Sequence, residues 1–194
     1  MPTGVALRDP REQLFEAAER ILLRDGPHAL TSRAVTTEAG CAKGVLHRHF
    51  ADFDDFLVEL VRDRTARVAT QADALHRSAG TGTVAGNLAA VLTDLFDSVA
   101  SSLVSLVIFR DELRVRLRRI YPTGVPLLAE AAAMIAAYLA AERDLGRIAP
   151  HADVDTVALT LIGSGHLLFA GGEPPDADAV HRVMSSAIAG VTAY

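Results

Sequence analysis

The chain has 194 residues, half of them hydrophobic, which allows a substantial core and argues against disorder. Its net charge of −5 gives no overall sign of a nucleic-acid binder, and its single cysteine excludes an internal disulfide and a multi-cysteine zinc site. No apolar run reaches the roughly 18 residues of a membrane span, and the N-terminal residues lack the apolar core of a signal peptide. We therefore expect a cytoplasmic protein with no membrane partner.

The first predicted helix begins after Asp9, which is a good N-cap, with Pro10 in the first helical position and Glu12 completing a capping-box-like pair. Apolar residues then follow at helical spacing up to Leu22. Gly26 and Pro27 end this helix.

Residues 31–50 read as two short helices joined by a tight turn at Gly40 and Cys41. Thr31 caps the first of them. Two helices closed by a glycine-bearing turn are typical of the helix-turn-helix unit, whose second helix enters the major groove of DNA. A small three-helix core is expected from Leu14, Ile21, Val35, Ala39, Leu46 and Phe50.

Asp52 is expected to cap a long fourth helix that could run to about His76, before a loop at residues 78–86. Further helices are predicted at Leu88–Val99, in one or two pieces at Leu103–Leu117, at Pro126–Glu142, and after the caps Asp153 and Asp176, with a break at Gly171-Gly172. Alanine and leucine are abundant, tryptophan is absent, and no alternating strand pattern is visible. The sequence predicts an all-α protein of about nine helices: a helix-turn-helix headpiece at 1–51 and a larger domain at 52–194, joined by the helix at 52–76.

Charge is distributed unevenly along this chain. Between residues 31 and 50, Arg33, Lys43 and Arg48 stand against Glu38 alone, a local charge of +2, whereas the rest of the chain is acidic. Such an asymmetry suits a protein that touches DNA with one small face.

The pattern at residues 31–60 resembles the tetracycline-repressor (TetR) family of bacterial transcriptional regulators. The elements that carry the resemblance are Thr31, Ala39-Gly40, Lys43-Gly44 and the segment Leu46–Phe50. The match in detail covers about the first 60 residues, and the remaining helices agree with the family only in number and order. The resemblance implies a ligand-responsive regulator, most simply a repressor, that binds a pseudo-palindromic operator as a homodimer.

Three positions depart from the family pattern. His47 replaces a common tyrosine, Ala42 replaces a common serine or threonine cap, and Phe53 stands where a lysine often reaches the DNA backbone. The absence of the cap costs about 1 kcal/mol of local stability. The absence of the lysine should slightly flatten the salt dependence of DNA binding.

The candidate DNA contacts lie in the two short helices. Hydroxyls at the start of the first helix suit a phosphate, cationic side chains suit phosphates or base edges, and a glycine lets the backbone approach the duplex. These residues are Thr31, Ser32, Arg33, Lys43, Gly44, His47, Arg48 and His49. His49 is equally compatible with a packing role. Cys41 is interpreted as a small packing residue, and a redox role stays open.

By resemblance, the middle helices should enclose a pocket for a small-molecule effector of unknown identity. The candidate lining is Leu92, Phe96, Val107, Phe109, Leu113, Met134, Tyr138, His166 and Phe169. Each of these could instead be ordinary core. The arginine-rich run at 110–119 is either a solvated face or an attraction for an anionic effector such as a carboxylate or an acyl-CoA.

The last two helices are the expected dimer surface, because small residues there allow close helix approach and a four-helix bundle across a twofold axis. The candidate interface is Leu161, Gly163, Ser164, Gly165, Val180, Met184, Ala187 and Ile188. The alternative is that these helices pack only within one chain.

An enzyme is not expected, because the sequence has no glycine-rich phosphate loop, no nucleophile elbow and no metal-spaced His/Cys set. No cofactor or metal is expected either. The alternative function is a helical ligand- or partner-binding protein whose DNA headpiece has degraded.

Overall fold

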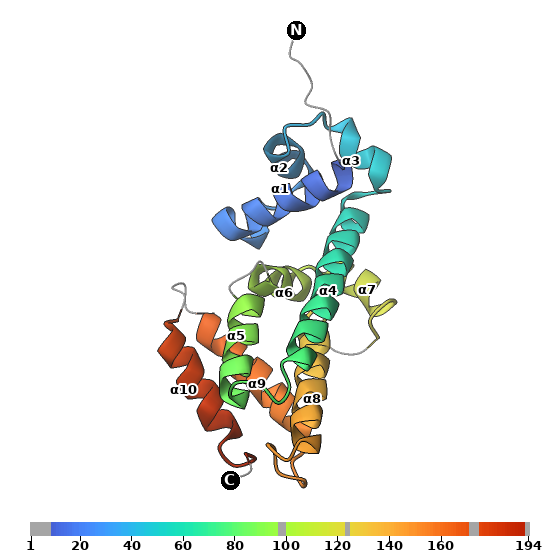
Figure 1. Ribbon diagram of the computed structural model, residues 1–194. Coiled ribbons are helices and arrows are strands. Elements are labelled where there is room, and N and C mark those ends of the chain that lie inside the picture. Colours follow the sequence, from blue (N-terminus) through green and yellow to red (C-terminus); the bar gives the residue numbers. More distant parts are fainter. Residues whose placement is uncertain (1–8, 97–99, 123–124, 171–174, 193–194) are drawn as a thin grey trace.

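The computed structural model describes residues 9–96, 100–122, 125–170 and 175–192. Val99 and the expected break at Gly171-Gly172 lie outside the described residues, as do residues 1–8. The described residues form ten α-helices, one short 3-10 helix and no strand beyond a single bridge between Ile148 and Thr192 (Figure 1). The all-α prediction is confirmed. The described residues contain ten α-helices rather than the predicted nine or so, because the stretch 103–117 is divided into two helices at Arg110.

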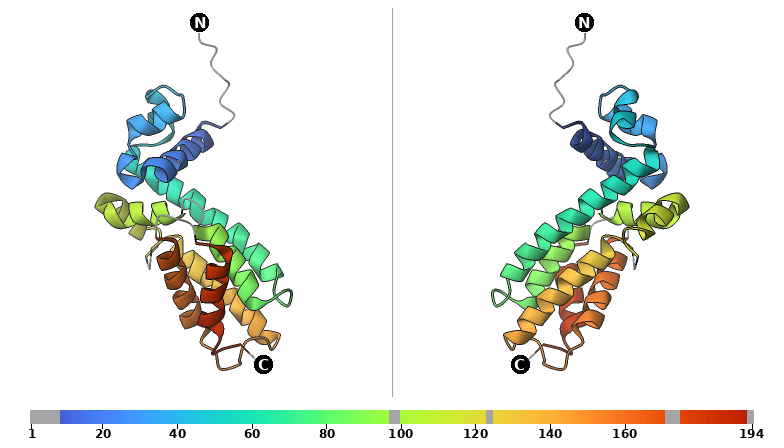
Figure 2. Two further views of the ribbon diagram at one scale, coloured as in Figure 1. Left: turned by 90° about the vertical axis from the view of Figure 1, so that its left-hand side faces the viewer. Right: turned by 90° about the vertical axis from the view of Figure 1, so that its right-hand side faces the viewer.

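The helices have the following bounds: α1 Pro10–Asp25, η1 Pro27–Ala29, α2 Ser32–Glu38, α3 Gly44–His49, α4 Phe53–Arg77, α5 Val84–Phe96, α6 Ala100–Phe109, α7 Asp111–Arg118, α8 Leu128–Asp144, α9 Val154–Phe169 and α10 Ala177–Ile188. Helices α1, α2 and α3 form the headpiece, α5 to α10 form the body, and α4 runs from one to the other (Figure 2).

Helix boundaries follow local capping chemistry. The carboxylates of Asp9, Asp52, Asp153 and Asp176 each accept a hydrogen bond from a backbone amide in the first turn of α1, α4, α9 and α10. Such side chains satisfy amides that otherwise lack a partner. All four caps were predicted from the sequence.

The headpiece is held by a compact apolar core. Leu14, Val35 and Leu46, one from each helix, are fully buried, as are Ile21 and Phe50. The turn between α2 and α3 passes through Gly40 at φ 64°, a backbone conformation that a glycine adopts without strain. Five of the six residues predicted for the three-helix core are therefore confirmed as buried, and Ala39 is half-buried against them.

An aromatic cluster joins the headpiece to α4. The ring of Phe50 lies edge-on to Phe56, with centroids 5.1 Å apart, and Phe15 packs against both rings. Edge-to-face aromatic pairs stabilise by more than their buried area alone. The end of α3 is thus fixed to the first turns of α4.

In the body, α8 packs against both α4 and α9, and α10 packs against α5 and α9. Helices α6 and α7 lie at the upper end of this bundle, next to α4 and the headpiece (Figures 1 and 2).

No single helix of the described ranges is both long and apolar enough to cross a membrane. Only α5 and α6 taken together, with a bend of 58° between them, reach that length and composition.

Candidate nucleic-acid interface

The predicted DNA contacts lie in α2 and α3 and at their N-caps. Seven of the eight side chains or backbone positions are exposed: Thr31, Arg33, Lys43, Gly44, His47, Arg48 and His49. Ser32 differs, because it is half-buried and its hydroxyl oxygen is buried without a hydrogen-bond partner. In this conformation Ser32 cannot offer its hydroxyl to a phosphate.

Thr31 is the N-cap of α2, and its hydroxyl oxygen accepts a hydrogen bond from the amide of Ala34 at 3.1 Å. Helix α3 begins at Gly44 with Lys43 as its N-cap, and no side chain of the described residues caps this N-terminus. A Cβ atom added to Gly44 would meet nothing within 4 Å. The backbone at Gly44 is therefore open to a neighbouring molecule.

The two candidate histidines are both exposed, but His49 also touches the protein. Its ring lies 6.4 Å, centroid to centroid, from the ring of Phe50. His49 therefore combines the two alternatives, since it packs on Phe50 and still faces solvent.

Three cations of this face have no acidic partner. Among the described residues, Arg33, Lys43 and Arg48 form no ion pair with a carboxylate. The one acid of the segment, Glu38, is held instead by Arg20 at 2.9 Å and Arg24 at 3.2 Å. These hydrogen bonds hold the pKa of Glu38 below its ordinary value. The electrostatic potential of this surface is therefore positive.

Cys41 lies in the turn beside these cations. It is half-buried and packs against the headpiece core. Burial raises the pKa of its thiol, which disfavours the reactive thiolate.

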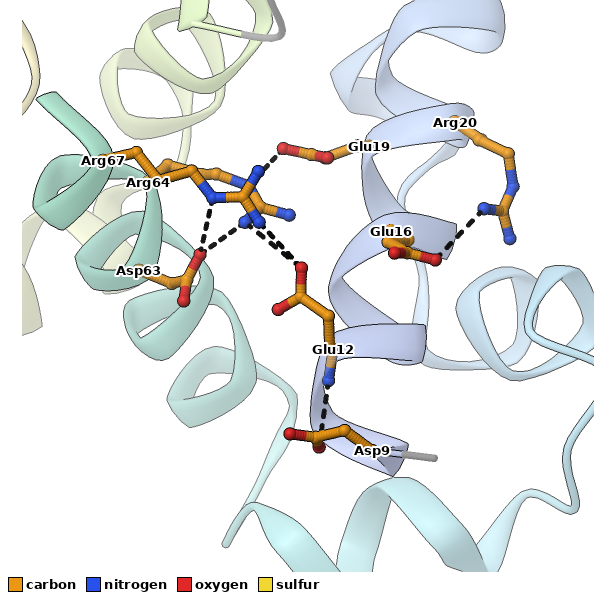
Figure 3. Close-up of polar contacts among 8 residues, drawn as sticks. All are labelled: Asp9, Glu12, Glu16, Glu19, Arg20, Asp63, Arg64 and Arg67. Carbon is orange, nitrogen blue, oxygen red and sulfur yellow. Dashed lines mark hydrogen bonds and ion pairs between the residues drawn. The ribbon is translucent and has the colours of Figure 1, made fainter. Parts of the chain in front are cut away.

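A network of arginines and carboxylates fixes α1 to α4 (Figure 3). Arg64 of α4 is only 5% exposed and binds Glu19 of α1 and Asp63 of its own helix. Arg67 binds Glu12 of α1 at 2.7 Å. Because both helices contribute charges, the network resists their separation. No sequence pattern pointed to it, since its members are 45 and 55 residues apart along the chain.

Arg11 makes a further link within the same interface. Its guanidinium lies 4.8 Å from the centre of the Phe50 ring and binds Glu59 of α4 at 3.0 Å. Cation–π contacts of this kind are attractive. One side chain of α1 therefore holds both the end of α3 and the side of α4.

Much of the arginine run at 110–119 is paired with carboxylates. Arg110 binds Asp54 at 2.8 Å, Arg116 binds Asp52, and Arg114 binds Asp111. Arg110 also lies 5.3 Å from the centre of the Phe53 ring. Three of the five arginines are thus neutralised, two of them by the first turn of α4.

Most of the predicted pocket lining is packed core. Leu92, Phe96, Val107, Leu113, Met134 and Tyr138 are buried, and none of the nine residues lines any of the five clefts found along the described surface. Phe109 cannot line an interior pocket, because it sits at the end of α6 and is 85% exposed. Its prediction was wrong, since helical spacing alone does not tell which face is outward.

Tyr138 is buried in a polar cluster. Its hydroxyl accepts a hydrogen bond from Asn87 at 2.9 Å, and burial, with a contact to Glu142, raises its pKa well above the ordinary value. His166 is half-buried beside the Phe96 ring, 6.1 Å away, and its Nδ1 has no partner. The Tyr138 hydroxyl is thus hydrogen-bonded within the core, whereas His166 is held there by ring packing alone among the described residues.

The predicted dimer residues fall mostly on the wrong faces of α9 and α10. Five of them are buried inside their own chain: Leu161, Gly165, Val180, Met184 and Ile188. Each helix turns its most apolar stripe toward α5 and the neighbouring helices, so these residues are not a surface. Gly163 is exposed, and Ser164 and Ala187 are half-buried.

The outward face of α9 instead carries two leucines. Leu159 is 64% exposed and Leu167 is 78% exposed, one helical turn on either side of Gly163. On α10, Val183 and Ala187 are half-buried.

Residues 14–60 match the family model described as "Bacterial regulatory proteins, tetR family". This span contains α2, α3 and most of α1. No curated protein matches the chain by sequence.

Solved structures share the fold over nearly the whole chain. A TetR-family transcriptional regulator from Agrobacterium tumefaciens has a TM-score of 0.71 at 15% identity, covering 95% of this chain and 98% of its own. The regulator FadR from Bacillus subtilis, solved with stearoyl-CoA, has a TM-score of 0.69 at 17% identity, covering 92% and 98%. A regulator from Saccharomonospora viridis, solved with choline, has a TM-score of 0.68 at 17% identity, covering 95% and 98%.

Proposed function

On the premise that residues 14–60 match the model of the tetR family of bacterial regulatory proteins, we propose that this chain is a TetR-family, ligand-responsive transcriptional repressor. It binds a pseudo-palindromic DNA operator as a homodimer, in the cytoplasm, and a small molecule releases it. The observation that carries the proposal is the exposure of Arg33, Lys43 and Arg48 in and beside α2 and α3, with no acidic partner in the described part of the chain.

These side chains have distinct roles on DNA. Lys43 and Arg48 supply charge from α3, which enters the major groove, and Arg33 supplies charge from α2. Thr31, His47 and His49 add hydrogen bonds to phosphates, and Gly44 lets the backbone come close. Ser32 contributes only after its hydroxyl turns outward.

Two copies are needed because one headpiece reads only a few base pairs. We place the dimer surface on the outward stripe of α9, Leu159, Gly163 and Leu167, extended by Val183 and Ala187 of α10. Apolar side chains around a glycine let helices approach closely across a twofold axis. The two headpieces would then meet half-sites about one helical turn of DNA, roughly 34 Å, apart.

Release follows from a difference in affinity. A ligand that binds one arrangement of headpiece and body better than the other shifts the population toward it. The ligand complexes of the Bacillus and Saccharomonospora regulators support an effector for this fold without identifying it here.

DNA binding can be tested with a duplex selected from a random pool by the purified protein. We expect binding whose affinity falls steeply with salt. The double variant Lys43→Ala/Arg48→Ala should flatten the slope of log affinity against log salt by about 0.9 for each phosphate that is no longer neutralised. The matched control is Arg77→Ala/Arg182→Ala, which removes the same charge from exposed positions of α4 and α10.

The control should bind like the unaltered protein. If no duplex is selected, or if both double variants bind equally well, the alternative of a helical ligand-binding protein with a degraded headpiece is favoured.

A further inference from the structure

A cavity of about 230 Å³ lies where the headpiece meets the body. Its wall includes Glu19 of α1, Arg64 and Val68 of α4, Leu103 of α6, and Leu127 just before α8. Its volume is several times the share of one water in the liquid, which is about 30 Å³. This space is large enough for a small organic molecule.

The cavity has one apolar and one polar side. Val68, Leu103 and Leu127 are at most 3% exposed and supply apolar surface. Polar groups come from Glu19, Arg64, Arg67 and Gln71. An apolar lining with a few polar groups is the usual character of a small-molecule site.

Leu127 adds a second, independent observation. Among the described residues it is the one non-glycine with a positive φ, 73°. Its amide donates to Glu130 at 2.9 Å, and its side chain is 2% exposed. Strained backbone of this kind persists only where the surroundings hold it, and it gathers at ligand sites.

Charge around Arg64 selects the chemistry of the ligand (Figure 3). Arg64 and Arg67, which both line the cavity, are already paired with the carboxylates of Glu19, Asp63 and Glu12. A carboxylate ligand would therefore find no unpaired cation beside Arg64, whose own side chain is only 5% exposed. Nη2 of Arg64 is nevertheless buried and has no hydrogen-bond acceptor among the described residues. A neutral oxygen satisfies that nitrogen without adding charge.

We infer that this cavity is the effector site, and that the effector is a neutral, mostly apolar molecule with one carbonyl or hydroxyl oxygen that accepts a hydrogen bond from Arg64. Its apolar part packs on Val68, Leu103 and Leu127. Since Glu19 belongs to the headpiece and Leu103 to the body, a bound molecule contacts both. Only the regulatory role of the ligand rests on the proposed function; its binding does not.

The test compares three probes of equal length and different charge: 2-octanone, octanoate and octylammonium. Calorimetric titration of the full chain without DNA should show saturable binding of 2-octanone, at least about tenfold tighter than that of either ion. Octanoate carries a charge that finds no unpaired cation, and octylammonium has no oxygen to accept a hydrogen bond from Arg64. Val68→Phe fills the cavity and should abolish binding. The matched control, Ala90→Phe, adds the same ring at an exposed position of α5 and should leave it unchanged.

Arg64→Lys provides a second variant if Val68→Phe does not fold. It keeps the charge but removes the guanidinium donor, and should weaken 2-octanone binding about fivefold. The inference is overturned if octanoate binds as tightly as 2-octanone, if 2-octanone shows no saturable binding, or if the folded cavity variants bind it unchanged. DNA binding measured without any probe decides the proposed function separately.

Discussion

Arg116 of α7 donates two hydrogen bonds to Asp52, at 2.9 and 2.8 Å, so that both oxygens of the α4 cap are held by the body. The same carboxylate accepts from the amide of Asp55 at 2.7 Å. One side chain thus starts the helix that carries the headpiece and ties it to α7.

This pair predicts a titration that depends on Arg116. The hydrogen bond from Arg116, more than the backbone bond from Asp55, holds the pKa of Asp52 below its ordinary value. Carboxyl NMR titration should show Arg116→Gln raising this pKa. Asp153 is the control, because its pKa is lowered by hydrogen bonds from Thr156 rather than by an arginine, and it should not change.

The lowered pKa of Asp52 also predicts how the stability of the protein changes with pH. A lowered carboxyl pKa contributes stability above the unfolded value of about 3.9, and this contribution disappears as pH falls through the folded pKa. The difference in Tm between the unaltered protein and Arg116→Gln should therefore shrink as pH drops from 6 toward 3. A constant difference would show that Asp52 and Arg116 are not coupled.

Phe53 has a packing role at the position where a lysine would reach the DNA backbone. Its ring stacks on Phe56, with centroids 5.6 Å apart, and lies under Arg110. Phe53→Lys should steepen the salt dependence of DNA binding by about 0.9 in slope if the new ammonium reaches a phosphate. It should also cost about 1–2 kcal/mol of unfolding free energy, because no ring then packs on Phe56 and Arg110. Phe53→Met, which adds no charge, should leave the salt slope as it was.

Local signals accounted for most of the fold. Caps such as Asp52 and breaks such as Gly26 are read from neighbouring residues, because the hydrogen bonds they make span only three or four positions. The headpiece core was equally readable, since Val35 and Leu46 lie within one short segment. Which face of a helix becomes buried depends on distant partners, and there the sequence was insufficient. Met184 of α10 packs inward, whereas Leu159 and Leu167 of α9 face outward.

The candidate DNA face was predictable, and the groups that support it were not. The exposure of Lys43 and Arg48 follows from a motif contained in 20 residues. Glu38 looked like a charge opposed to DNA, but Arg20 and Arg24 of α1 neutralise it. No periodicity links those positions, because the contact comes from the packing of one helix on another.

Cys41 is expected to react slowly. Burial raises the pKa of its thiol, and the thiolate is the reactive form. Alkylation by iodoacetamide at pH 7.5 should be slower than that of free glutathione and should accelerate in denaturant. A faster reaction in the folded protein would instead favour a redox role.

The outward leucines of α9 test the proposed dimer. Leu159→Arg with Leu167→Arg places two charges in the proposed interface, where burying them is costly. Sedimentation velocity should then show a monomer where the unaltered protein forms a dimer. Leu145→Arg changes a leucine that is 57% exposed away from this stripe and should leave the dimer intact.

Two glycines of α9, two residues apart, should respond oppositely to alanine. A Cβ atom on Gly165 would lie 2.7 Å from Cε2 of Phe96, a buried ring stacked on Phe169 and so unable to move aside freely. Gly165→Ala should therefore cost about 1–3 kcal/mol of unfolding free energy. A Cβ atom on Gly163 meets nothing within 4 Å in the single chain. Gly163→Ala should stabilise the isolated chain by about 0.5–1 kcal/mol, because alanine favours the helix.

Protein concentration separates the two environments of Gly163. In the proposed dimer its open face meets the partner helix, so the added methyl group should weaken association while it stabilises the monomer. Denaturant unfolding at low concentration should show the gain, and sedimentation at rising concentration should show a larger dissociation constant. If Gly163→Ala stabilises the chain and leaves association unchanged, this stripe of α9 is not the surface through which two copies pair.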